Sequence, residues 1–408
     1  MPSWLMEAGA WVMSITTSAY RYAPIASFLN EDDTEVRKQT RIRDSYTWAD
    51  LYARVTANTW TANCVVTSRI NAGAGNQTIT VPAATTGVFE DNVNSDAIVN
   101  GDLVNWRIAA APGAGTVNLS VISSSLTAVG NVTLFISSAG LEIQNFGLTQ
   151  YTTVLGVTDF IAAEVDAQLL VRQASTLSNL RAYLRTNTLD GASTLRLRVN
   201  GGNVNQVLNI GAGVTGEFED AVNTDNIVSG NRIDYQVVTG GTAGGIGLTH
   251  TQMKSAAPNR WLGCGHAFGT VFDDGETNYI VGEGSLGSSS VEANVQTEAR
   301  VAITLTNLFV RVIANSLGSG STLRTRRNGG NGNLNVSIGA GATGEFEDIV
   351  NSDGYAAADL YNFQLVTGPD NGTIALTIIS VEEGPPAPAP GAFLGGNIAS
   401  RMLAGRLI

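Results

Sequence analysis

A cluster of acidic and amide side chains occurs three times in this 408-residue chain and is its clearest candidate for chemistry. The segment reads Phe-Glu-Asp-x-Val-Asn-x-Asp and starts at Phe89, Phe218 and Phe346. Ca²⁺ takes six to eight oxygen ligands, more than the side chains of one segment supply, and the spacing of an EF-hand loop is absent. Two interpretations stay open, a turn whose side chains bond their own backbone and a calcium site. The candidate ligands are Asp91, Asn94, Asp96, Asp220, Asn223, Asp225, Asp348, Asn351 and Asp353.

Other residues with catalytic chemistry are scarce. The two histidines are His250, which aligns with aliphatic residues of a strand, and His266, which forms only a Cys-x-His pair with Cys264. Neither arrangement supplies a nucleophile with its base or a set of three zinc ligands. The sequence Gly211–Gly216 resembles a dinucleotide-binding loop, but an acidic segment follows it instead of a helix. We therefore predict a protein that is not an enzyme and that needs no cofactor, with calcium as the one alternative.

The acidic segment belongs to a longer repeat. Its three copies are separated by 129 and 128 residues, and the same offsets align many other positions without a gap. The aligned sets include Arg43/Arg172/Arg300, Arg69/Arg198/Arg326 and Glu35/Glu164/Glu292. The chain therefore contains three copies of one module.

Within a module, apolar and polar residues alternate. Leu180, Ala182 and Leu184 alternate with Arg181, Tyr183 and Arg185, which predicts a strand with one buried face. Asn-Gly-Gly and similar turn signals separate such segments. About eight strands in about 128 residues predict an all-β fold of three tandem jelly-roll-like β-sandwich modules with extended N- and C-terminal arms.

The repeat sets the expected domain boundaries. We expect an N-terminal arm over 1–29, modules over 30–143, 144–267 and 268–383, and a Pro-rich spacer with a C-terminal docking segment over 384–408. The apolar side chains of both arms, together with two outward-facing positions of the third module, are candidates for contact with a partner or a neighbouring module. These interface candidates are Trp4, Trp11, Phe309, Ile313, Phe393, Leu394, Ile398, Met402 and Leu403.

A repeated set of charged and polar residues predicts structural contacts. Glu35, Gln39 and Arg43 are spaced by four residues and share one strand face, where Arg69 and Glu90 would join them in a polar network. Such a network fixes a loop or an interface more often than it catalyses a reaction. The three modules are compatible with a ring around a pseudo-threefold axis and with a rod.

Composition excludes several classes of protein. The formal net charge of −12 disfavours a protein that binds nucleic acid through its phosphates, and only two lysines are present. No run of about 18 apolar residues occurs, so we expect no membrane-spanning helix. Two cysteines about 200 residues apart define no disulfide framework.

Three acidic, lysine-poor sandwiches in tandem resemble virion structural proteins of tailed bacteriophages, particularly capsid-decorating and tail or fibre proteins built from repeated jelly-roll modules. The resemblance covers about residues 30–383 and rests on the triplicated Gly-x-Phe-Glu-Asp-x-Val-Asn-x-Asp pattern and the strand layout. It implies a non-enzymatic component of a virion that binds other structural proteins and copies of itself, without nucleic acid or membrane.

Two alternatives to a virion protein would place the chain outside or on the surface of a cell. A secreted or cell-surface adhesin would bind a host-surface glycan, and an extracellular filament subunit would use the C-terminal segment as its link. Glycan sites usually display exposed aromatic residues. The aligned aromatics Trp106, Tyr235 and Phe363 are predicted to face inward, which disfavours the adhesin.

Overall fold

The computed structural model describes residues 3–16, 20–110, 115–128 and 133–385. Within these ranges the chain forms 30 strands in six sheets and three short 3-10 helices. The predicted all-β class with a sandwich-like architecture is confirmed. No helix in the described ranges is long and apolar enough to cross a membrane.

Each module pairs two sheets around its own apolar core. We call the sheet that holds the first and last long strands of a module the inner sheet, and the other one the outer sheet. In module 1 the inner sheet has the order β3(Ser27–Phe28), β1(Ser3–Ile15), β10(Val117–Ala128), β5(Tyr46–Asn58), β8(Gly87–Ile98), and the outer sheet has β2(Tyr20–Ala23), β9(Leu103–Ala110), β6(Cys64–Ile70), β7(Gly73–Val81), with β4(Thr40–Arg41) also on β9.

Modules 2 and 3 repeat this layout. In module 2 the inner sheet is β13(Gly156–Val157), β11(Thr133–Asn145), β20(Gly245–Ser255), β15(Ser175–Asn187), β18(Gly216–Ile227), and the outer sheet is β12(Thr149–Thr152), β19(Arg232–Val238), β16(Ser193–Val199), β17(Gly202–Ile210), with β14(Leu169–Leu170) on β19. In module 3 the inner sheet is β21(Arg260–Asp273), β30(Thr373–Gly384), β25(Ile303–Asn315), β28(Gly344–Tyr355), and the outer sheet is β23(Ser288–Ser289), β22(Thr277–Ile280), β29(Leu360–Val366), β26(Ser321–Arg327), β27(Gly330–Ile338), with β24(Thr297–Glu298) on β29. The 3-10 helices η1(Glu35–Lys38), η2(Glu164–Asp166) and η3(Glu292–Asn294) lie before β4, β14 and β24.

The described module limits differ from those expected from the repeat. Residues 3–15, expected in an arm outside the modules, form β1, which pairs antiparallel with β10 inside module 1. Likewise β11 and β21 pair with the last strands of modules 2 and 3, so each module starts earlier than its expected boundary. The first strand finds its partner more than 100 residues further along the chain, and the alternation within residues 3–15 does not reveal that pairing.

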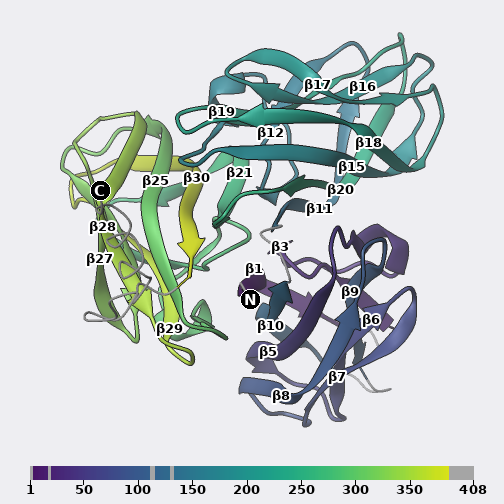
Figure 1. Cartoon of the computed structure of the whole chain (residues 1–408). Coiled ribbons are helices and arrows are strands. Elements are labelled where there is room, and N and C mark those ends of the chain that lie inside the picture. The colour runs from purple at the N-terminus through teal and green to yellow at the C-terminus, as the bar shows by residue number, and fades with distance from the viewer. Residues whose placement is uncertain (1–2, 17–19, 111–114, 129–132, 386–408) are drawn as a thin grey trace, which may run out of the picture.

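The three modules form a closed ring (Figure 1). Their first strands meet in the middle of the ring, where β3 lies against β11 and β13, and β13 lies against β21. Glycines permit this approach, because a Cβ atom at Gly156 would lie 2.2 Å from the backbone nitrogen of Gly265, and one at Gly284 would lie 2.1 Å from the carbonyl oxygen of Gly9. The structure therefore has the ring form of the two arrangements that the sequence allowed.

Burial along the central strands explains how the modules pack. In β5, β15 and β25 three consecutive residues are buried, which breaks the alternation expected of a strand with one solvent-exposed face. The middle residue of each triplet, Tyr52, Arg181 or Phe309, points away from its own module core. The outward face of each inner sheet is thus covered by the preceding module of the ring, with module 3 preceding module 1.

Candidate functional site: the interfaces between modules

Three equivalent ion pairs join the modules around the ring. Arg43 of module 1 binds Glu219 of module 2 with an N–O distance of 2.6 Å. Arg172 of module 2 binds Glu347 of module 3. Arg300 of module 3 binds Glu90 of module 1 at 2.9 Å. Equivalent residues make equivalent contacts at all three interfaces, so the ring has a pseudo-threefold axis.

The predicted polar network is therefore divided between two places. Arg69 binds Glu35 within module 1 at 2.9 Å, and the copies of this pair in the other modules are also internal. Arg43 and Glu90 instead bind residues of different neighbours. One part of the network fixes the 3-10 helix of its own module and the other part fixes the interfaces.

The outward-pointing residue in the middle of β5, β15 and β25 differs from one interface to the next. Phe309 is 3% exposed and packs in the apolar cluster of module 2, together with Trp261 and Ile378. Tyr52 packs in the apolar cluster of module 3, together with Leu5 and Val121. Phe309 was a predicted interface candidate, and the structure places it between modules 3 and 2. The other candidate of this strand, Ile313, is partly buried beside Gly269 of its own module.

The interface between modules 2 and 1 is polar at the same position. The guanidinium of Arg181 is fully buried, donates to the carbonyl of Gln39 at 3.1 Å, and lies 2.6 Å from Nε2 of His250. Burial and the neighbouring Arg181 lower the pKa of His250 well below its usual value. Burial also lowers the pKa of Lys38, which donates to Asn30 in this interface, to about 7. His250, which aligns with aliphatic strand residues of the other modules, is thus an interface residue.

The interface between modules 3 and 1 contains a buried charged cluster, which we call the closing cluster. Its members are Glu7 of module 1 and Arg260, Glu283 and Glu383 of module 3, each at most 3% exposed. Arg260 binds Glu283 and Glu383, the latter at 3.3 Å. The sequence did not reveal this cluster, because Glu7 was expected in an arm outside the modules.

A comparison of the modules shows that this cluster is specific to one interface. At the position of Glu7, given by the pairing with the last strand of each module, modules 2 and 3 have Ile136 and Gly263. Arg260 lies opposite Glu383, where module 1 has Trp4 opposite Leu126 and module 2 has Thr133 opposite Ser255. Glu283 aligns with the apolar Leu155. An alignment that included the first strands would have revealed these charges.

The acidic segments are bulges of β8, β18 and β28. The register of β5 against β8 jumps at Asp50, a residue with a φ of 59°, and residues 92–94 form the bulge. Oδ1 of Asp91 accepts bonds from the backbone N–H groups of Val93 and Asn94, and Oδ2 accepts one from Thr78. Asp220 and Asp348 accept the same bonds in the other modules.

The predicted calcium ligands thus have protein donors as partners. Asn94 donates its amide to Asp91 at 3.0 Å, and Asp96 accepts bonds from Ser68, Asn76 and Gln77 instead of facing Asp91. Asn223, Asp225, Asn351 and Asp353 repeat these roles. Within the described residues no group of three or more His, Cys, Asp or Glu side chains is placed to hold a metal ion. The arrangement closes the bulge and ties β7 to β8.

The tip of each bulge displays a valine. Val93, Val222 and Val350 are 88%, 87% and 88% exposed, although such apolar side chains are usually buried. The pseudo-threefold axis places all three at equivalent positions of the ring. Among the described residues they form a set of exposed large apolar side chains that is identical in all three copies.

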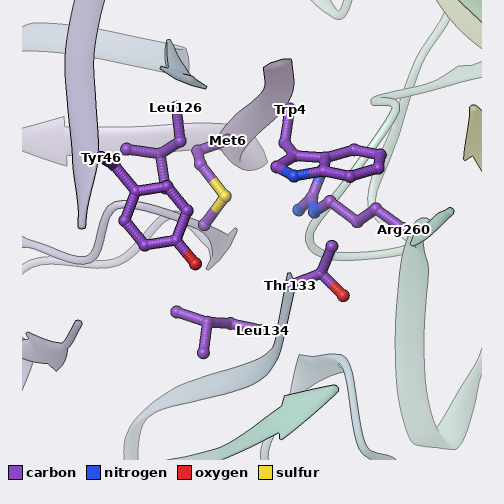
Figure 2. A pocket seen from close by; sticks show the side chains of 7 residues that line it. All are labelled: Trp4, Met6, Tyr46, Leu126, Thr133, Leu134 and Arg260. Atoms are coloured by element: carbon purple, nitrogen blue, oxygen red, sulfur yellow. The ribbon is translucent and has the colours of Figure 1, made fainter. Parts of the chain in front are cut away.

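A small cavity lies where the three modules meet (Figure 2). Trp4 and Arg260 line it together with Met6, Leu126 and Leu134. The cavity volume open to the centre of a water molecule is about 10 Å³. This is room for roughly one water molecule. The cavity is therefore part of the packing between modules and is too small for a metabolite.

The remaining interface candidates lie partly outside the described residues. Trp4 is 3% exposed and packs in the core of module 1, on strand β1. The side chain of Trp11 lies outside the described part of the chain. So do Phe393, Leu394, Ile398, Met402 and Leu403.

Comparisons with known proteins assign no family to this ring. No protein-family model matches the sequence, and no curated protein matches it.

Proposed function

We propose that the chain is a non-enzymatic structural component of a large assembly, most consistent with a virion protein of a bacteriophage such as a capsid-decorating or tail or fibre protein. The observation that carries this proposal is the closed pseudo-threefold ring. Each of its three interfaces is bridged by an ion pair of residues that the repeat retains, Arg43/Glu90 and their copies. The retained polar residues are thus used for architecture.

The ring also suits attachment to a partner with threefold symmetry. Val93, Val222 and Val350 present three equivalent apolar contacts, each weak when taken alone. Three simultaneous contacts raise the affinity far above that of one, because the second and third form within the same complex. Repeated subunits around the symmetry axes of a shell or tube provide such partners.

The burial of the aligned aromatics favours a structural role over glycan binding. Trp106, Tyr235 and Phe363 are at most 1% exposed, inside the three sandwiches. Within the described residues the repeat therefore carries no exposed aromatic platform for a sugar ring.

Electron microscopy of native particles tests the proposal. Antibodies raised against the recombinant chain, applied to particles purified from cultures that express it, should label one type of virion at regular positions. Labelling confined to the host cell surface, or binding of the recombinant ring to a glycan array, would contradict it.

A truncation tests attachment through the C-terminal segment. Because β30 ends at Gly384, the deletion should begin at residue 386. We expect the shortened chain to keep its three folded modules and to be lost from particles. As a control, the full-length chain with Val93→Thr, Val222→Thr and Val350→Thr keeps the β-branched shape of the bulge and separates attachment by the ring from attachment by the segment. Normal incorporation of both variants would refute attachment by these two surfaces.

A further inference from the structure

The interface between modules 3 and 1 closes the ring, although these two modules are not consecutive in the chain. Modules 1 and 2 are consecutive, with β10 followed by β11, and modules 2 and 3 are consecutive, with β20 followed by β21. Along the chain, modules 3 and 1 are linked only through module 2, so their contact depends on non-covalent interactions alone. Because each module has its own apolar core, we expect the modules to stay folded when this contact separates.

The closing cluster is concentrated at this contact. Glu7 accepts hydrogen bonds from the hydroxyls of Thr297, at 2.8 Å, and Tyr361, at 2.5 Å. Arg260 donates to the carbonyl of Leu5 as well as to Glu283 and Glu383. The cluster therefore contains three buried carboxylates and one guanidinium, which binds two of them. If all three were ionised, two negative charges would be uncompensated away from water, which is unfavourable.

Among the described residues, Arg260 is the one cation that acts on Glu283 and none is a main influence on Glu7, while Arg54 lies beside the hydroxyl of Tyr52. Tyr52 on β5, Tyr361 on β29 and Cys264 on β21 face Glu7 or Glu283, and burial raises the pKa of each of them, that of Tyr52 to about 12. They stay neutral between pH 5 and 9. At the rim, Arg300 is occupied by Glu90 and Glu298. The excess negative charge is relieved only by protons on the carboxylates.

We propose that this interface is a proton-operated latch, in which the closed ring holds protons on the carboxylates of the closing cluster and weakens when they are lost. The proposal does not depend on the proposed function.

The direction of the effect follows from linkage. Burial raises the pKa of Glu7 to about 7, and raises that of Glu283 to about 7 against the opposing effect of Arg260. A solvated glutamate in the open ring has a pKa near 4.5. The closed ring therefore binds more protons than the open one between these values, so closure is favoured at acidic pH and weakens as the pH rises from about 4.5 to about 7.

Two backbone amides report directly on the latch. The N–H of Leu5 donates to Glu383 at 3.0 Å, and the N–H of Glu7 donates to Glu283 at 3.3 Å. Because backbone groups alternate along a strand, the N–H groups of Trp4 and Met6 point the other way, toward β10 in the same module. Opening of the latch exposes the first pair of amides and leaves the second pair protected.

Hydrogen exchange of the full chain at single-residue resolution, corrected for the intrinsic pH dependence of exchange, tests the proposal. Between pH 5.5 and 8.5 we expect the protection of the Leu5 and Glu7 amides to fall at least tenfold relative to that of Trp4 and Met6. A local readout is needed because the interface of Lys38 and His250 contributes a pH dependence of opposite sign to the global stability.

Variants decide the outcome. Glu7→Gln and, separately, Glu283→Gln should flatten the pH dependence, since an amide cannot lose the proton. The control Glu90→Gln removes the rim ion pair of the same interface and should lower protection while keeping the dependence on pH. Equal protection of Leu5 and Glu7 at both pH values in the wild type would overturn the proposal. So would an unchanged pH dependence in both glutamine variants.

Discussion

Replacement of Phe309 by alanine should uncouple module 3 from module 2. Phe309 is 3% exposed and lies in the apolar cluster of module 2, where Phe135 and Trp261 stack at 5.0 Å. Truncation of a buried phenylalanine costs about 3–5 kcal/mol. Because the phenyl group of Phe309 points away from the core of its own module, we expect the loss of free energy at the interface between modules and not within the β-sandwich.

Guanidinium unfolding with hydrogen exchange measures this effect. In Phe309→Ala we expect a separate, earlier transition for one of the two modules, with the amides of β29 in the outer sheet still protected under native conditions. The control Phe363→Ala removes a ring of similar burial from the core of module 3, and there the amides of β29 should lose protection. A loss below about 1 kcal/mol in Phe309→Ala, or the same exchange pattern in both variants, would refute the reasoning.

Three further predictions concern the bulges and the axis. Asp220→Ala leaves two backbone N–H groups of the bulge and that of Val207 on β17 without their acceptor, and should lower stability by about 1–3 kcal/mol. Thermal unfolding measures the loss against Asp190→Ala, which removes an acceptor in an exposed loop. A chelator should leave the melting temperature unchanged, because N–H groups occupy the carboxylates; a fall that added Ca²⁺ reverses would restore the calcium interpretation. Gly156→Ala places a Cβ 2.2 Å from the backbone of Gly265 at a φ of +83° and should loosen the ring, measured as a larger sedimentation frictional ratio, whereas Gly213→Ala, also at positive φ but in open space, should not.

The fold class could be predicted from local patterns. Alternation in segments such as Leu195–Val199 and the turn signal Asn200-Gly201 specify a strand and its end, because side-chain direction and left-handed backbone are local properties. The burial of Trp106 and its copies follows from the same alternation. The acidic bulges were recognised as repeated units, and their bonding within the segment was one of the two interpretations.

The interfaces could not be predicted in the same way. The sequence treated Arg181 as a solvent-facing strand residue, yet its guanidinium is fully buried against module 1. Alternation shows that a residue points away from its own core and is silent on what covers it. Glu7 was missed because its neighbours in space, such as Tyr361, lie more than 350 residues away in the chain.

The sequence by itself determined that the chain is all-β, that it contains three copies of one module, and which polar residues each copy retains. Only the tertiary structure decided that Arg43 binds Glu219 of the next module instead of Glu90 of its own, and that the modules close into a ring. The physical reason is that copies of a repeat offer identical partners at every position. A local pattern cannot distinguish a bond within a module from the same bond to its neighbour, whereas the packing of the inner sheets can.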